Sequence, residues 1–242
     1  MSQRAHITDH ELPIEGDAPL RYVAIDRRQT GDGAVPLVIG LHYGWEGDLP
    51  ARHARDFTRV FLEPTFAAER AVLLAPYCPE RTWHHPRSVA AVLALREHAI
   101  ANLGVDPAHV VLAGYSLGGM GTWFLGPRHP DLFAAGIAVA AVPILYPDDP
   151  DVSGLERFVE LADQGVFGWR PELKTFPMWV VNSRADELIP HPAVAKTVER
   201  MRRRGGQVDF TSLDGVGHYD SRQYVDALRP VVAEVLQRTA SG

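Results

Sequence analysis

The 242-residue chain contains one cysteine, Cys78, so no disulfide can form within it. Cys78 lies between Tyr77 and Pro79, just after a predicted strand. We expect a buried thiol that takes no part in chemistry, because a serine elsewhere in the chain stands in a better context for a nucleophile.

Basic residues are not in excess. The chain has 24 Lys and Arg against 30 Asp and Glu, which gives a net charge of −6. A nucleic-acid-binding protein needs a basic face, so we expect no nucleic-acid partner. The long basic cluster, residues 200–204, stands at the end of a predicted helix, where cations complement the helix dipole.

Long hydrophobic runs are also absent. No stretch approaches the length needed to span a bilayer, and residues 1–17 lack the apolar run of a signal peptide. We therefore expect a cytoplasmic protein without a membrane anchor. A hydrophobic content of 46% and the chain length suit one soluble α/β domain, residues 1–242.

Apolar runs alternate with amphipathic segments along the chain. The predicted strands cover residues 21–26, 36–41, 71–75, 110–113, 134–142, 176–181 and 207–213. The predicted helices cover residues 88–103, 117–125, 192–204 and 221–238, with Ser88 as the first N-cap and residues 51–69 partly helical. This alternation predicts an α/β fold, in which helices cover both faces of a mostly parallel sheet.

Two segments stand outside this alternation. Residues 1–18 are expected to be a loose lead-in or an edge strand. Residues 147–175 are acidic and interrupted by proline and glycine, and they fit either a small lid or a helix with a long loop.

One motif carries most of the functional information. The run at 110–113 leads into Gly114-Tyr115-Ser116-Leu117-Gly118 and then into a helix. This strand-turn-helix context is that of a nucleophile elbow, in which a serine sits on a sharp turn above a parallel sheet. The turn requires small residues two before and two after the serine, and both are glycine here.

A serine hydroxyl becomes a strong nucleophile when a histidine takes its proton and a carboxylate orients that histidine. Asp186 and His218 follow the predicted strands 176–181 and 207–213, at the carboxyl ends where α/β sheets place their sites. Glu187 and then Asp214 are the rival acids, whereas His191 is expected to begin a helix.

The reaction also needs two donors for the oxyanion of its tetrahedral intermediate. The first is expected to be the backbone N–H of Leu117. The second should come from residues 42–47, and counting two past His42 gives Gly44, with Tyr43 or Trp45 if the loop is shifted. His42 itself is expected to hold the loop.

Aromatic residues gather near these loops in the sequence. We expect Trp45, Trp83 and Tyr115 to line the substrate pocket and Trp123 to belong to the core. His84 and His85 are adjacent, so their side chains point in different directions, and no further ligand cluster accompanies them. We therefore expect no metal site.

From residue 37 to about residue 236 the chain resembles serine esterases of the α/β-hydrolase superfamily, in particular the small carboxylesterase/phospholipase and polyhydroxybutyrate-depolymerase-like groups. The resemblance rests on Leu41-His42-Tyr43-Gly44, on residues 114–121, on His129-Pro130-Asp131-Leu132-Phe133-Ala134-Ala135, and on the loops that carry Asp186 and His218. Such esterases commonly have His-Gly where this chain has His42-Tyr43-Gly44. The resemblance implies a hydrolase of carboxylic esters, sometimes of thioesters, that needs no cofactor.

Together these features predict a serine carboxylesterase that cleaves small esters of short to medium acyl length through an acyl-enzyme on Ser116. An acyl-thioesterase or lysophospholipase-like hydrolase with the same triad is the alternative. Peptidase and acyltransferase activities are less favoured, because no dedicated site for a second substrate is visible. A non-catalytic binding protein on this fold would be expected to lack one of the three triad residues.

Overall fold

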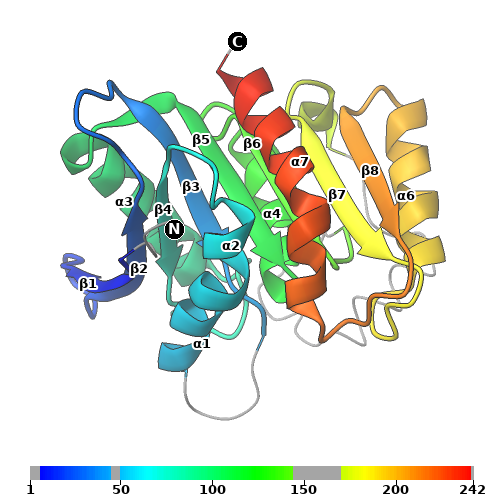
Figure 1. Ribbon diagram of the computed structural model, residues 1–242, viewed down its shortest axis with the longest axis horizontal. Helices are drawn as coiled ribbons and strands as arrows, with labels where there is room; N and C mark the ends of the chain where they lie inside the picture. The colour runs from blue at the N-terminus through cyan, green and yellow to red at the C-terminus, as the bar shows by residue number, and fades with distance from the viewer. Residues whose placement is uncertain (1–5, 45–49, 144–169, 241–242) are drawn as a thin grey trace.

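The computed structural model describes residues 6–44, 50–143 and 170–240. In these residues one sheet runs through the molecule with the strand order β1-β2-β4-β3-β5-β6-β7-β8 (Figure 1). The strands are β1 (Thr8–Leu12), β2 (Leu20–Asp26), β3 (Val35–Leu41), β4 (Val72–Pro76), β5 (Val105–Tyr115), β6 (Ala135–Val139), β7 (Met178–Ser183) and β8 (Val208–Leu213). From β4 to β8 neighbouring strands are parallel, whereas β1 and β2 are antiparallel at one edge.

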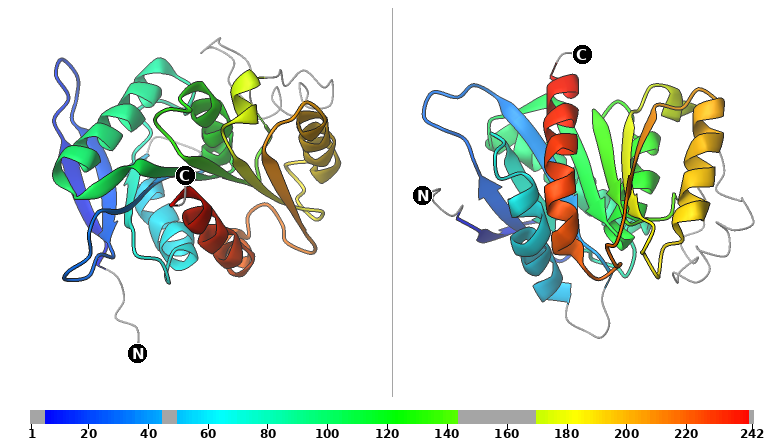
Figure 2. Two further views of the ribbon diagram at one scale, coloured as in Figure 1. Left: turned by 90° about the horizontal axis from the view of Figure 1, so that it is seen from above. Right: turned by 45° about the vertical axis from the view of Figure 1, so that its right-hand side comes forward.

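Helices cover both faces of the sheet (Figure 2). One face packs against α3 (Pro86–Asn102), α4 (Leu117–Leu125) and α6 (His191–Arg203). The other face packs against α7 (Ser221–Thr239) and against α1 (Pro50–Phe57), which continues through a π-helical turn (Thr58–Leu62) into α2 (Glu63–Thr65). Because both faces are covered, every residue of β4, β6 and β7 is buried, which explains why these strands contain no charged residue. The predicted fold class is confirmed.

The start of α3 differs from the prediction. Ser88 is not the N-cap, because it lies fully buried inside the helix. The helix begins at Pro86, and the His85 side chain accepts a hydrogen bond from the backbone N–H of Arg87 at 3.3 Å. Proline suits the first helical position because its missing N–H is one that would have no partner within the helix.

For residues 1–18 the sequence allowed either a loose lead-in or an edge strand, and the structure shows an edge strand. Residues Thr8–Leu12 form β1 and pair with β2, so they extend the sheet at its edge. Most of the segment 147–175 lies outside the described residues, and its end forms a short 3₁₀ helix, Pro171–Lys174. No helix within the described ranges combines the length and apolar character that a bilayer crossing requires.

The topology brings four loops together. Strands β3, β5, β7 and β8 are parallel members of one sheet, so their carboxyl ends lie at the same edge (Figure 1). The loops that leave these ends carry His42, Ser116, Asp186 and His218. An open α/β sheet places its sites at this edge, and these four loops form the candidate site.

Candidate active site

Ser116 occupies the turn between β5 and α4 with a φ of 54° and a ψ of −118°. A positive φ is strained for a residue other than glycine and costs on the order of 1–3 kcal/mol. The surrounding structure holds this geometry, because the Ser116 N–H donates to the carbonyl of Val139 at 2.9 Å. The serine therefore sits on a sharp elbow, as the sequence predicts.

The two glycines of the motif allow backbone to approach backbone. A Cβ at Gly114 would lie 2.1 Å from the carbonyl oxygen of Gly118, and a Cβ at Gly118 would lie 1.8 Å from that of Leu41. Neither contact is sterically allowed, so both positions require glycine. The second contact also presses the start of α4 against the end of β3.

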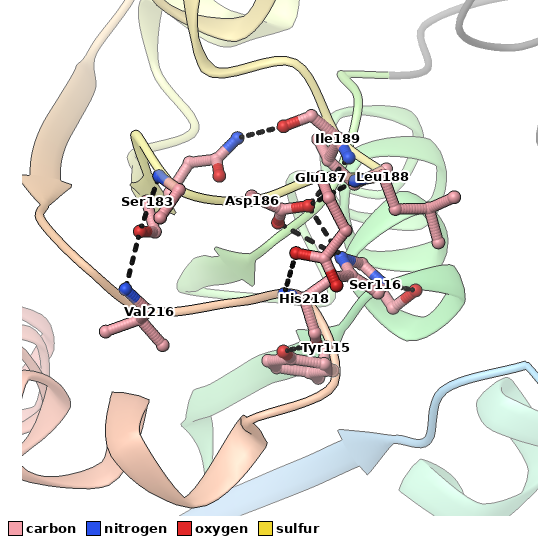
Figure 3. A network of polar contacts seen from close by, with 11 residues as sticks. Tyr115, Ser116, Ser183, Asp186, Glu187, Leu188, Ile189, Val216 and His218 are labelled. Carbon is pink, nitrogen blue, oxygen red and sulfur yellow. Dashed lines mark hydrogen bonds and ion pairs between the residues drawn. The ribbon is translucent and has the colours of Figure 1, made fainter.

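His218 lies between Ser116 and Asp186 (Figure 3). Its Nε2 is 2.9 Å from Ser116 Oγ, and its Nδ1 is 3.0 Å from Asp186 Oδ2 and 3.1 Å from Oδ1. An ionised carboxylate can only accept, so the hydrogen-bond network assigns the proton to Nδ1 and leaves Nε2 to accept from the serine hydroxyl. His218 is 3% exposed and Asp186 is 8% exposed. This is the geometry of a catalytic triad.

The loop after β7 fixes the Asp186 carboxylate. Its Oδ1 accepts from the backbone N–H groups of Leu188 at 3.0 Å and Ile189 at 2.7 Å. The buried Ser183 hydroxyl then joins this loop to the loop that carries His218, because Oγ accepts from Ala185 N–H and Val216 N–H, both at 3.2 Å. Asp186 and His218 are thus held by a shared hydrogen-bond network (Figure 3).

The backbone of His218 is held from two sides. Its N–H donates to Glu187 Oε2 at 2.9 Å, and its carbonyl accepts from the Tyr115 hydroxyl. Tyr115 is 3% exposed and packs in the core, so the structure assigns it a supporting role and not the predicted place on a pocket wall. Burial raises the pKa of the Tyr115 hydroxyl, so this group remains a hydrogen-bond donor.

The loop after β3 is held by His42. The buried imidazole accepts from Cys78 N–H through Nε2 at 3.2 Å and donates from Nδ1 to the carbonyl of Tyr43 at 2.7 Å. Burial lowers the pKa of His42 to about 4, so the ring is neutral and can both accept and donate.

Trp83 belongs to the same loop support. It is 1% exposed and its Nε1 donates to the carbonyl of His42 at 3.0 Å. The prediction that Trp83 lines the pocket is therefore wrong for the described structure, since the indole is enclosed by the core. Trp45, the other predicted pocket residue, lies outside the described residues.

Gly44 and Leu117, the residues predicted to supply the oxyanion donors, lie near one another. Gly118 packs on β3, and a Cβ at Gly44 would lie 3.6 Å from the Leu117 side chain, so Gly44 and Leu117 are neighbours across the site. Leu117 is the first residue of α4, where backbone N–H groups have no partner within the helix. Tyr43 is adjacent to Gly44, and its carbonyl is bound by His42.

The remaining candidates have structural roles. Asp214 is exposed and pairs with Arg184 at 3.0 Å, and His191 is the first residue of α6. Trp123 is fully buried in the core, as predicted. Cys78 is buried, which raises the pKa of its thiol to about 12 and keeps it protonated.

Sequence reasoning missed the hydrogen bonds of Ser183, Glu187 and the Tyr115 hydroxyl. In the sequence, Ser183 and Glu187 are marked only by their closeness to Asp186, and Tyr115 only by its place beside Ser116. Within the described ranges no group of three or more His, Cys, Asp or Glu side chains is placed to hold a metal ion.

The chain is similar to proteins of known structure. Residues 85–150 match the model of the prolyl oligopeptidase family, Peptidase_S9, whereas no curated protein sequence matches the chain. A thermostable esterase is 20% identical with a TM-score of 0.67, over 96% of this chain and 62% of that one, which is less than two thirds of its length.

Two further structures are similar over more of their own length. An esterase from Pyrobaculum calidifontis is 15% identical with a TM-score of 0.68, over 96% of this chain and 86% of that one. The fluorophosphonate-binding serine hydrolase F of Staphylococcus aureus is 11% identical with a TM-score of 0.70, over 97% and 99% of the two chains. These likenesses establish the α/β-hydrolase fold. The triad geometry and the family match together are those of a serine hydrolase.

The close approach of Gly118 to Leu41 generates a stability prediction. Gly118→Ala should lower the free energy of unfolding by about 3 kcal/mol, because its Cβ meets a backbone oxygen that cannot rotate away. Gly33→Ala is the matched control, since a Cβ there meets nothing within 4 Å, and it should change stability by less than about 0.5 kcal/mol. Urea unfolding measures both. Equal stability of the two variants would contradict the tight packing of α4 on β3.

The buried, neutral His42 generates a pH prediction. Its pKa is lowered from 6.5 to about 4, so the folded state binds fewer protons than the unfolded state in this range. His42 stabilises the fold above pH 6.5, and this contribution is lost as the pH falls towards 4. His42→Gln places a neutral side chain there, so its free energy of unfolding should fall less steeply between these pH values. Parallel curves for the two proteins in urea unfolding would contradict the prediction.

Proposed function

We propose that this serine hydrolase cleaves carboxylic esters, with Ser116 as nucleophile, His218 as general base and then acid, and Asp186 as the residue that orients His218. The observation that carries the proposal is the continuous line of contacts from Ser116 Oγ through His218 to Asp186, at 2.9 and 3.0 Å. Each group lies in the order that serine activation requires.

The proposed reaction has two halves. Ser116 Oγ attacks the acyl carbonyl while its proton passes to His218 Nε2, and the tetrahedral intermediate expels the alcohol, which takes that proton. Water then attacks the acyl-enzyme, gives a proton to His218, and releases the carboxylic acid as the proton returns to Ser116. Asp186 stabilises the imidazolium in both halves of the reaction, and its hydrogen bond keeps a proton on His218 Nδ1.

We assign the oxyanion donors to the N–H groups of Leu117 and Gly44. The carbonyl and N–H of a trans peptide point in opposite directions, so binding of the Tyr43 carbonyl by His42 turns the Gly44 N–H away from His42. Gly44 lies beside Leu117, whose N–H is at the positive end of α4. Two such donors stabilise the charge of the tetrahedral intermediate.

Hydrolysis of a peptide bond is the second candidate, and a specific observation favours it. The matching family model is that of prolyl oligopeptidases, and one similar structure is described as a dipeptidyl aminopeptidase IV. Of that structure, however, the chain covers 36%. Similar structures that the chain spans almost completely include one described as a ferulic acid esterase, at 99% coverage, so we favour esters. Thioesters need the same residues.

Substitution of the triad tests the nucleophile. Ser116→Ala and His218→Ala should each lower kcat by roughly 10⁴ to 10⁶, and Asp186→Asn should lower it somewhat less, because the three residues act as a unit. A fluorophosphonate probe should label the wild-type protein and not Ser116→Ala. Ser212→Ala is the matched control, since Ser212 bonds to His191 away from the triad, and it should be labelled normally. Near-full turnover by Ser116→Ala would refute the assignment.

A substrate panel tests the choice of bond. We expect p-nitrophenyl esters with short to medium acyl chains to be cleaved best, and a matched acyl thioester to be cleaved less well. Aminoacyl-prolyl p-nitroanilides should have a kcat/KM at least about a hundredfold lower, since an amide needs its nitrogen leaving group protonated. A higher kcat/KM for the anilides than for every ester would establish the peptidase alternative.

A further inference from the structure

All the polar groups of His218 are engaged. The ring binds Ser116 and Asp186, the carbonyl accepts from Tyr115, and the N–H donates to Glu187. Of the first three partners, Asp186 and Tyr115 are buried and Ser116 is half-buried. The fourth comes from an exposed side chain that belongs to the residue directly after Asp186 (Figure 3).

The Glu187 carboxylate reaches His218 across a glycine. A Cβ at Gly217 would lie 3.3 Å from Glu187 Oε2, so a larger residue there would crowd the carboxylate against the His218 N–H. The bond is 2.9 Å long and is charge-assisted, which makes it about twice as strong as a bond between neutral groups. It connects the loop of the acid to the loop of the base.

Charge at this position is retained in the folded protein. The hydrogen bond from the His218 backbone lowers the pKa of Glu187, so the carboxylate is ionised at neutral pH. In the part of the chain that the structure describes, Glu187 has no ion-pair partner, and the nearby Arg184 pairs with Asp214 instead.

We propose that Glu187 is a positioning residue for catalysis, which fixes the His218 loop through its backbone and favours the imidazolium through its charge. The inference rests on the proposed function, because it assigns Glu187 to the triad described there. Two separable contributions follow: the carboxylate oxygen holds the backbone of His218, and the negative charge favours the positive charge that the His218 ring carries during the reaction.

Other charged and titratable groups also surround His218. They are Asp186 from the loop after β7, Tyr115 from β5, Tyr219 and Asp220 from its own loop, and Tyr224 of α7, which packs against Tyr115. Asp186 remains in every variant proposed below, and so do the other four. A change between variants therefore reports Glu187 alone.

Two substitutions separate geometry from charge. Glu187→Gln keeps a carbonyl oxygen of the same reach and removes the charge, whereas Glu187→Asp keeps the charge and withdraws the oxygen by one methylene. Asp214→Asn is the matched control, because it removes an exposed carboxylate that bonds to Arg184 and not to His218. The measurement is kcat and KM for a p-nitrophenyl ester from pH 5 to 9, with the rate of fluorophosphonate labelling at each pH.

For Glu187→Gln we expect a kcat within about threefold of wild type at high pH, with the acid limb of the profile moved about half a pH unit lower. This direction follows because loss of a nearby negative charge disfavours imidazolium, and the small size is that expected of an exposed, solvent-screened charge. For Glu187→Asp we expect an unmoved acid limb and a kcat about tenfold lower with little change in KM, because a charge-assisted bond is lost. Asp214→Asn should match wild type in both.

Distinct outcomes would overturn the inference. If both Glu187 variants retain the wild-type kcat and pH profile, Glu187 has no part in positioning His218. If Asp214→Asn moves the acid limb as far as Glu187→Gln does, the shift arises from the net charge of the protein and not from the contact of Glu187 with His218. If wild-type protein fails to react with the fluorophosphonate, the proposed function itself fails, and the inference falls with it.

Discussion

The hydrogen bonds between the Asp186 carboxylate and His218 are the constraint on which this site depends. The two residues are 32 positions apart in the chain, and parallel pairing of β7 with β8 brings their loops to one edge of the sheet. Neither loop contains regular structure that could hold a side chain within tenths of an ångström. The loops are therefore held by Ser183, Glu187 and Tyr115, and the ring of His218 is aimed at Ser116 as a result.

Much of the fold could be predicted because its signals are local. Continuous apolar runs indicate buried parallel strands. The two glycines around Ser116 are required because a side chain at Gly114 would clash with the backbone of Gly118, and one at Gly118 would clash with the backbone of Leu41. The order Ser116, Asp186, His218 could be predicted for a related reason, since the carboxyl ends of parallel strands meet at one edge. The proposed roles of these residues follow from general chemistry applied to that placement.

The sequence could not reveal how the aromatic residues near the site pack. Trp83 and Tyr115 are close along the chain to the loops of the candidate site, which suggests a pocket, but both are buried and use their polar atoms to hold backbone. Whether an indole faces solvent or a carbonyl depends on the tertiary path of distant segments. The prediction that Ser88 caps α3 failed for a similar reason, because the helix begins two residues earlier, at Pro86, with His85 as its cap.

The contact between Gly118 and the Leu41 carbonyl has a consequence for how such an enzyme can diversify. With backbone pressed on backbone, the start of α4 and the end of β3 cannot shift relative to one another, so Ser116 and His42 keep a fixed spacing. New substrate preferences then cannot arise from adjusting that distance. They must arise in segments that border these two elements without belonging to them, where insertion and substitution leave the reacting atoms in place.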